Sequence, residues 1–466
     1  MEGRDIIATA IGLSRFAVVG EGIGGMLKVR VSDFRVDEEI KSVSLDPKGR
    51  FTVARISLTN WETNRFINRM AKTLRMSRDR IWFAGTKDKR AITRQLFIID
   101  SRREKVAEVE IPDVEIEIIG RTHQKIGFGS HRGNIFTVVV RGCCDENGKP
   151  LSEVDALARI EVIKQEMEEV VGAGQFPNWI GPQRFGANRP VTSLVGRHVV
   201  EGDFEGAVLT YLGMAGVGES PEVEVFRGAI RAGKDFSATL EICPERLGYE
   251  ATMLSHLVTK PDDWVGAFGR LPRNLQLMTV HALQSEIFNR SLGARLDAGL
   301  PLNTPLEGDM VAPLDERGAV NIERAVVTTA ETQTRIGRNC ILQRLVVVGT
   351  LPGNGIELPQ GKGGKIESTV ISALGLDEID WLVSAIARLS TKGSRRALVS
   401  SFSEFAVDTV PIAEGESLSE RWQAGPQEGD VWHPEGACLR FRFKLPPGAY
   451  ATTFLREFMR VPLRQL

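Results

Sequence analysis

The chain has 466 residues, of which 42% are hydrophobic and 26% charged, so it is long enough for two or three domains and too apolar to be disordered. Its 59 Lys and Arg and 60 Asp and Glu give a net charge of −1, which excludes a uniformly basic protein but not local phosphate-binding patches. The five cysteines form no CxxC pair, which disfavours a disulfide framework or a zinc ribbon. We see no signal peptide and no apolar run of about 18 residues, so we expect a soluble, cytoplasmic protein without a membrane span.

Strands and helices alternate irregularly along the chain. Strand patterns cover 16–20, 26–36, 50–58, 79–85, 94–100, 114–120, 133–142 and 437–450. Helical patterns cover 63–77, 157–171 and 451–460, and further helical stretches with Gly- and Pro-rich connections lie between about 187 and 397. This mixed order predicts an α+β fold with a largely antiparallel sheet.

Several common site motifs are absent or misplaced. Gly20, Gly22 and Gly25 match GxGxxG, but the alternating apolar residues of "MLKVRV" predict a strand where a dinucleotide site needs a helix. A nucleotide-dependent dehydrogenase is therefore disfavoured. The glycine-rich "GNGIELPQGKGGK" lacks the P-loop spacing, the six histidines are scattered, and neither HExxH nor GxSxG occurs. We expect no metal and no cofactor.

One acid, Asp88, lies within a dense basic cluster. The segment "FAGTKDKRAITRQ" runs from Phe83 to Gln95 and surrounds this acid with Lys87, Lys89, Arg90 and Arg94. Taken alone, Asp88 fits a solvated turn residue paired with a neighbouring lysine. However, nearby cations also keep a carboxylate ionised as a nucleophile or base, and they can hold the phosphate backbone of a nucleic acid. Both interpretations stay open for this segment.

Three other segments carry candidate binding residues. In "KIGFGSHRGNIF", Lys125 adds charge, Asn134 can read the edge of a base and Phe136 can stack on its face, as in single-stranded RNA recognition. The alternative is a hairpin turn in which Phe136 belongs to the core. "FPNWIGPQRFG", which contains Arg184, and "RFKLPPGAYATTFLRE", which contains Tyr450, each fit a packed loop or corner when taken alone.

Together these segments resemble the TruD family of pseudouridine synthases along nearly the whole chain. "SDFRVDEEI" resembles the family's DFxVxE segment, "AGTKDKRAITRQ" its signature around the catalytic acid, "RGNIF" its GNxF and "PNWIGPQRFG" its PNxxGxQRFG loop. "HALQSEIFNR", "GDMV", "LPGNG", "KGSRRAL" and "LPPGAYATTFLRE" resemble later family segments. The two longest signatures have rigid spacing, so their coincidence by chance is negligible.

The resemblance implies an α+β catalytic domain with a mixed, mainly antiparallel sheet and a central cleft, interrupted by an inserted α/β TRUD domain. On this basis we expect residues 1–186 and 398–466 to form the two parts of the catalytic domain, and 187–397 to form the insertion. Two segments distant in sequence would then enclose one cleft.

The resemblance also implies conversion of uridine to pseudouridine in tRNA, at the family's uridine 13, without a cofactor or an obligate protein partner. Asp88 takes the catalytic role, and the residues on family positions that contact the target nucleotide are Phe34, Asn134, Phe136 and Tyr450. Candidates for phosphate contact or support of the acid are Lys87, Lys89, Arg90, Arg94, Lys125 and Arg184. The alternative is a non-catalytic RNA-binding protein or RNA chaperone on the same fold.

Overall fold

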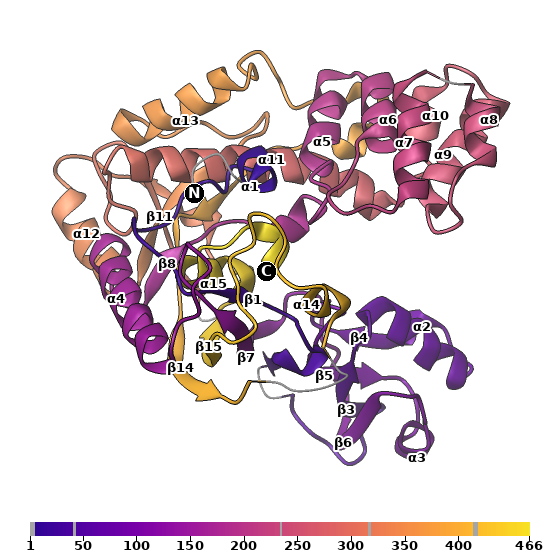
Figure 1. Cartoon of the computed structure of the whole chain (residues 1–466), viewed down its shortest axis with the longest axis horizontal. Coiled ribbons are helices and arrows are strands. Elements are labelled where there is room, and N and C mark those ends of the chain that lie inside the picture. The colour runs from indigo at the N-terminus through magenta and orange to yellow at the C-terminus, as the bar shows by residue number, and fades with distance from the viewer. Residues whose placement is uncertain (1–4, 41–42, 234, 316–317, 413–417) are drawn as a thin grey trace.

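A nine-stranded sheet built from both ends of the chain dominates the structure, a computed structural model (Figure 1). The structure describes residues 5–40, 43–233, 235–315, 318–412 and 418–466. The main path of the sheet runs β14-β15-β7-β2-β5-β3-β6, with β1 added to β7 and β4 to β5. Its strands are β1 Gly24–Met26, β2 Phe34–Ile40, β3 Phe51–Thr59, β4 Ile81–Phe83, β5 Ile92–Ile99, β6 Val114–Thr122, β7 His131–Cys143, β14 Ser403–Val410 and β15 Cys438–Leu445.

The pairing in this sheet is mixed but mainly antiparallel. β2 and β5 are parallel, and every other pairing among its described strands is antiparallel. The register sets Phe443 of β15 opposite Phe136 of β7, so the C-terminal strands β15 and β14 extend the sheet on the side of β7. The expected α+β fold with a mainly antiparallel sheet is confirmed.

Helices cover the two halves of the sheet with separate cores. α4 (Glu153–Val171) and α15 (Ala451–Met459) contribute apolar side chains to the core that contains β7 and β15. α2 (Thr63–Thr73) buries Phe66 and Met70 in another core, against β3 and β5. The loop between β4 and β5 and the segment around β2 lie where the two halves of the sheet meet. They are therefore placed between two packed cores.

The middle of the chain forms a helical group and a second sheet. The helices are α5 Thr192–Glu201, α6 Phe204–Gly213, α7 Pro221–Arg231, α8 Phe236–Glu241, α9 Gly248–Thr259, α10 Trp264–Phe268, α11 Arg273–Asp297, α12 Gln333–Ile341 and α13 Gly361–Ala373. An antiparallel sheet in the order β10-β9-β11-β12 is formed by β9 Met310–Pro313, β10 Val326–Val327, β11 Leu345–Leu351 and β12 Ser394–Ala397. The short helices elsewhere are α1 Ile6–Ala10, α3 Arg103–Ala107 and α14 Glu420–Gln423.

The long helix α11 connects the helical group to the rest of the molecule. Figure 1 shows α5 to α10 gathered at one end, with α11 running from them across the top of the view. Its Ile287 belongs to the core of the helical group, whereas the next residue, Phe288, belongs to the core of the main sheet. One helix therefore contributes side chains to both cores. The expected domain boundaries at 186/187 and 397/398 stay a prediction.

Strand pairing changes near the second expected boundary. β12, which ends at Ala397, pairs with β11 in the second sheet. The next strand, β13 (Val399–Ser401), pairs with β8 (Gln175–Pro177), which precedes the helical group in sequence. The chain therefore returns to the neighbourhood of residues 175–177 within a few residues of leaving the second sheet.

The expected strand over 26–36 is interrupted, which corrects the prediction for this segment. β1 ends at Met26, Lys28 has a φ of 56°, and Val31–Asp33 is a 3₁₀ helix before β2 begins at Phe34. The buried Asp33 carboxylate accepts hydrogen bonds from the Arg30 N–H and from Arg141, which holds this turn in place. Because a strand and a 3₁₀ turn follow the glycines, the GxGxxG match has no helix to form a dinucleotide site.

Candidate active site

Segments from five parts of the chain enclose a cavity of about 420 Å³ beside the main sheet. They are β2, the loop between β4 and β5, the start of β7, the turn at Gln183 and the corner that leads into α15. The lining residues are Phe34, Val36, Ala84, Gly85, Thr86, Lys87, Asp88, Phe128, Gly129, His131, Asn134, Phe136, Gln183, Gly448, Ala449, Tyr450, Ala451 and Thr452. The cavity therefore contains the predicted acid together with all four predicted substrate-binding residues.

Asp88 lies in the loop after β4 and is paired with a lysine that is distant in sequence. Lys28 Nζ donates to Asp88 Oδ2 at 3.1 Å. The Asp88 side chain is 37% exposed and that of Lys28 18%, so the acid stays accessible from the cavity while its cation is more deeply placed. The Lys28 ammonium also lies 4.7 Å from the centre of the Phe34 ring. Asp88, Lys28 and Phe34 thus form one contiguous group.

Arg90 holds the backbone that presents Lys28. Its Nε donates to the carbonyl oxygen of Lys28 at 2.8 Å, and its Nη2 donates to that of Val29 at 3.0 Å. Lys28 has a positive φ, a conformation that costs a non-glycine residue free energy and needs support from its surroundings. One basic residue of the predicted cluster therefore acts on Asp88 indirectly, through the position of Lys28.

The other three basic residues of this cluster make no ion pair with Asp88 in the described structure, although Lys87 lines the cavity. Lys87 Nζ lies 2.7 Å from Glu38 Oε1 in a pair whose side chains are 8% and 0% exposed. Arg94 Nη2 lies 2.9 Å from Glu117 on an exposed face. Lys89 is exposed and makes no ion pair with any residue that the structure describes. Lys28 was missed because 60 residues separate it from Asp88, and its one sequence signal is a lysine among apolar residues shortly before "SDFRV".

Two phenylalanines from neighbouring strands form an apolar wall of the cavity. The rings of Phe34 and Phe136 meet edge to face with centres 6.2 Å apart, and Phe136 stacks on Phe443 at 5.3 Å. Phe34 is 2% exposed and Phe136 7%, so both are fixed in the core and present only part of a ring to the cavity. Phe136 is therefore a core residue that also lines the cavity. That it stacks on a base stays a prediction.

Asn134 carries a polar group with no hydrogen-bond partner among the described residues. Its side-chain Oδ1 is buried and accepts no hydrogen bond from the residues that the structure describes. Such a group costs about 1–3 kcal/mol when it is left unsatisfied, so it is rare without a reason. Because Asn134 lines the cavity, a ligand that offers an N–H donor would satisfy this oxygen.

The opposite wall comes from the C-terminal corner and from the turn that contains Gln183. Tyr450 directly precedes α15, and a Cβ on Gly181 would lie 2.8 Å from its ring, so this glycine permits close packing of the two segments. Gln183 Nε2 donates to Thr452 Oγ1 at 3.3 Å across the same contact. Residues more than 260 positions apart thus enclose the cavity together.

Lys125 and Arg184, like Lys89, Arg90 and Arg94, do not line this cavity. Lys125 Nζ lies 4.3 Å from the centre of the Trp82 ring and does not line the cavity. Arg184 lines a second cavity on the other side of the Tyr450 corner, whereas the preceding Gln183 lines the first. Neither basic residue therefore lies beside Asp88.

Two further observations concern the part of the chain that the structure describes. No group of three or more His, Cys, Asp or Glu side chains is arranged to hold a metal ion. No helix there is long and apolar enough to cross a membrane.

A family model described as tRNA pseudouridine synthase D (TruD) matches residues 10–458 of the chain. The chain belongs to the TruD family. A protein of Methanosarcina mazei named probable tRNA pseudouridine synthase D is 34% identical over 456 residues, which covers 98% of both chains. A protein of Halobacterium salinarum with the same name is 33% identical over 468 residues, covering 97% of both.

A solved structure is similar over the same extent. The crystal structure of a TruD protein from Methanosarcina mazei matches with a TM-score of 0.81 and 32% identity, and it covers 99% of both chains. The sequence segments that resemble TruD signatures are the ones that enclose the Asp88 cavity: "SDFRVDEEI" leads into β2, "AGTKDKRAITRQ" spans the Asp88 loop and β5, and "RGNIF" begins β7. "PNWIGPQRFG" and "LPPGAYATTFLRE" supply the opposite wall.

Proposed function

We propose that the protein isomerises uridine to pseudouridine in tRNA, that uridine 13 is its target, and that Asp88 is the catalytic carboxylate. The observation that carries the proposal is the Asp88 cavity, which combines an accessible acid, an adjacent ammonium, an apolar wall and an unsatisfied amide oxygen. Membership of the TruD family supports the reaction class.

The cavity offers the target base complementary contacts. The N3–H of uracil is a hydrogen-bond donor, and the buried Oδ1 of Asn134 is an acceptor without a partner in the described structure. Phe34, Phe136 and Tyr450 offer aromatic surface around it. Leaving the RNA stack costs the base a few kcal/mol, and aromatic stacking returns about 1–3 kcal/mol of this.

The reaction breaks the C1′–N1 glycosidic bond and forms a C1′–C5 bond in its place. The C5 proton is then lost and N1 gains a proton, so the reaction is an isomerisation without net oxidation or reduction. Asp88 serves it in one of two ways: its carboxylate attacks the nucleotide as a nucleophile, or it takes a proton from the sugar as a base. In both routes the carboxylate must start ionised and accessible.

Lys28 has a defined part in this proposal. Its ammonium holds Asp88 Oδ2 at 3.1 Å and leaves the second carboxylate oxygen to face the nucleotide. The charge-assisted hydrogen bond fixes the direction of the carboxylate, so the acid is pre-organised before RNA enters. The detached base must be retained while it turns, and the enclosing walls at Phe34 and Tyr450 serve that purpose.

The test of the target position uses unmodified tRNA transcripts incubated with the purified protein. Pseudouridine is located by carbodiimide modification followed by primer extension. We expect one new stop that corresponds to uridine 13, and none in a transcript with cytidine at that position. A stop elsewhere would contradict the target but keep the chemistry, whereas tRNA binding without any stop would favour the non-catalytic RNA-binding alternative.

A further inference from the structure

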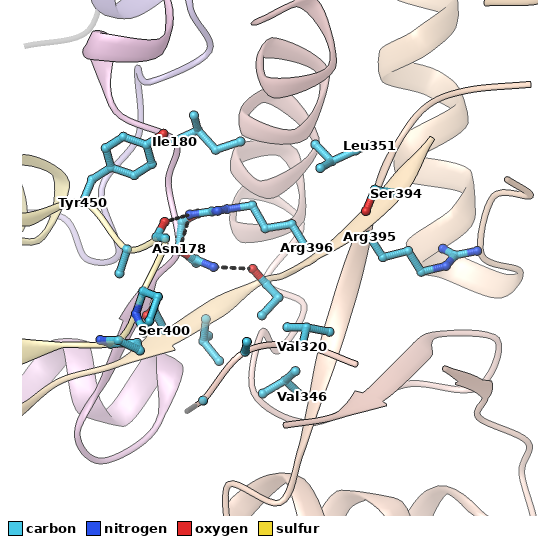
Figure 2. Close-up of a pocket in the computed structure, with 18 of the residues that line it drawn as sticks. Asn178, Ile180, Val320, Val346, Leu351, Ser394, Arg395, Arg396, Ser400 and Tyr450 are labelled. Atoms are coloured by element: carbon cyan, nitrogen blue, oxygen red, sulfur yellow. Dashed lines mark hydrogen bonds between the residues drawn. The ribbon is translucent and has the colours of Figure 1, made fainter. Parts of the chain in front are cut away.

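A second cavity of about 510 Å³ adjoins the first (Figure 2). The two cavities share Gly448, Ala449 and Tyr450, so the corner before α15 separates them. The other walls come from α11, from β12 and β13, and from the segment around Asn178. The cavity thus lies where the helical middle of the chain meets the main sheet, and no step of the reaction above uses it.

The described lining of the second cavity carries positive charge and no acidic side chain. Its charged or titratable cationic residues are Arg184, His281, Arg395 and Arg396, and the described lining includes no Asp or Glu. The Arg395 guanidinium does not face the same space as Arg396, because Figure 2 shows its side chain pointing away from Arg396 and Tyr450. Its Nη2 instead donates to the Glu357 carbonyl oxygen at 2.6 Å.

Arg396 is fixed in place by neutral acceptors. Its Nε donates to the Asn178 carbonyl oxygen at 3.1 Å, and its Nη2 donates to the Asn178 side chain and to the Gly448 carbonyl oxygen (Figure 2). Its Nη1 donates no hydrogen bond to the residues that the structure describes. Burial lowers the pKa of Arg396 to about 10, so the guanidinium is still charged at neutral pH.

Arg184 adds a second cation close to the first. Its side chain makes no hydrogen bond or ion pair with the residues that the structure describes. Arg184, His281 and Arg396 line the same cavity, and after burial the charge of Arg184 contributes to lowering the pKa of the other two. Two arginines that face one cavity without an acid repel each other, and an anion between them relieves that repulsion.

We propose that the second cavity binds a nucleotide of the RNA substrate next to the target uridine, with its phosphate held by Arg184 and Arg396. The inference rests on the proposed function, which supplies the RNA and the target. The size of the cavity suits a nucleotide rather than a simple anion. Tyr450 lines both cavities, so consecutive nucleotides can be splayed on either side of its corner.

The first test measures RNA binding in the Asp88→Asn background, where the RNA is not converted. Arg184→Gln is the preferred variant, because Arg396 also holds Asn178 and Gly448 and its loss would disturb the wall. We expect Arg184→Gln to weaken binding of unmodified tRNA about fivefold to tenfold and to reduce the log–log salt slope by about 0.7–0.9, as for one lost phosphate contact. Arg103→Gln, on the exposed helix α3, is the matched control and should change neither quantity.

The second test locates the phosphate. Single phosphates around the target uridine are replaced by neutral methylphosphonates, and each RNA is measured with and without Arg184→Gln. We expect one replacement within about two nucleotides of the target to weaken binding, and to add no further loss once Arg184 is removed, as in a double-mutant cycle. The inference would be overturned if the loss from Arg184→Gln and the loss from the phosphate replacement added fully at every position. It would also be overturned if the phosphate coupled to Arg184 lay farther from the target.

The inference and the proposed function fail in different ways. If the unmutated protein forms no pseudouridine but the coupling at one phosphate is present, the proposed function fails and the RNA contact stands. If pseudouridine forms and Arg184→Gln binds tRNA as tightly as its parent, the inference fails alone. Arg184-dependent binding of inorganic phosphate or uridine monophosphate with unchanged tRNA affinity would assign the cavity to a free anion and would also overturn it.

Discussion

Lys28 Nζ lies 3.1 Å from Asp88 Oδ2, although 60 residues separate the two in sequence. The pair forms because the segment after β1 leaves the sheet at Lys28 and crosses to the loop between β4 and β5. Arg90 holds the backbone at this crossing. The acid, its cation and the residue that positions the cation therefore come from only two segments of the chain.

Replacing Lys28 should impair the chemical step more than RNA binding. Lys28→Met removes the charge but keeps the length of the side chain, and it leaves Asp88 without its fixed orientation. We expect single-turnover pseudouridine formation to slow by about 10- to 150-fold, the effect of losing a charge-assisted hydrogen bond worth roughly 1.5–3 kcal/mol. Lys105→Met is the control, because Lys105 on α3 is exposed and makes no ion pair with the described residues. A Lys28→Met variant as fast as the control would remove Lys28 from the mechanism.

Replacing Asn134 should separate stability from activity. Its Oδ1 is buried without a donor among the residues that the structure describes, so Asn134→Ala removes an unsatisfied group from the free enzyme. We expect no fall in the thermal midpoint and a loss of about 5- to 150-fold in kcat/KM, corresponding to roughly 1–3 kcal/mol for the contact to the base. Thermal denaturation and steady-state kinetics on one preparation check both parts. A destabilised variant with full activity would show that Asn134 is structural.

Tyr450 should act through its ring and not through its hydroxyl. No hydrogen bond from the hydroxyl is formed with the described residues, whereas the ring lines both cavities. Tyr450→Phe should therefore retain close to full activity. Tyr450→Leu should lower kcat/KM by about 5- to 150-fold, in line with roughly 1–3 kcal/mol of stacking per base. Equal losses in the two variants, measured under the same conditions, would instead assign the role to the hydroxyl.

The pair formed by Asp33 and Arg141 should be essential to stability. Arg141 donates to both Asp33 oxygens at 2.7 and 2.8 Å, and the two side chains are 2% and 7% exposed. Asp33→Ala leaves a buried guanidinium without its partner, so we expect the free energy of unfolding to fall by about 3–5 kcal/mol in denaturant titrations. Asp408, paired with Arg440 on the surface, is the matched control, and Asp408→Ala should cost little. Similar losses in both would contradict the argument from burial.

His281 should report on the charge of the second cavity. Burial, and then the charge of Arg184, lower the pKa of His281, so the imidazole is neutral at pH 7. Its lowered pKa means that the folded state loses stability as the pH falls through the ordinary histidine range, where an unfolded imidazole takes up its proton. Arg184→Gln should raise the His281 pKa, as followed by NMR titration with His281→Asn for assignment. An unchanged pKa would place Arg184 away from the histidine.

The sequence predicted which segments form the site, but it did not predict where the charged groups Lys28 and Arg184 lie in it. The segments around Asp88, Asn134 and Tyr450 were recognisable because each is long and rigidly spaced, and the structure brings them to one cavity. Lys28 was not recognisable, since its contact depends on a break in a strand that the apolar alternation of "MLKVRV" conceals. The place of Arg184 could not be predicted either, because adjacent residues of one 3₁₀ turn line different cavities.

The strand order was also beyond the sequence pattern. Alternating apolar residues predict that β2, β5, β7 and β15 are strands, but they do not state which strands are neighbours. The parallel pairing of β2 with β5 brings Asp37 beside Arg94, and the antiparallel pairing of β15 with β7 brings Phe136 beside Phe443. Such contacts follow from the packing of the whole sheet and not from local propensity.

The most direct test of the account follows the C5 proton of the target. Forming the C1′–C5 bond releases this proton, so tRNA transcribed with 5-tritiated uridine should release tritium to water in a single turnover with the unmutated protein. We predict that Asp88→Asn releases none while it binds the same tRNA with an affinity close to that of the unmutated protein. Tritium release by Asp88→Asn at the unmutated rate would contradict the assignment of Asp88 as the catalytic carboxylate.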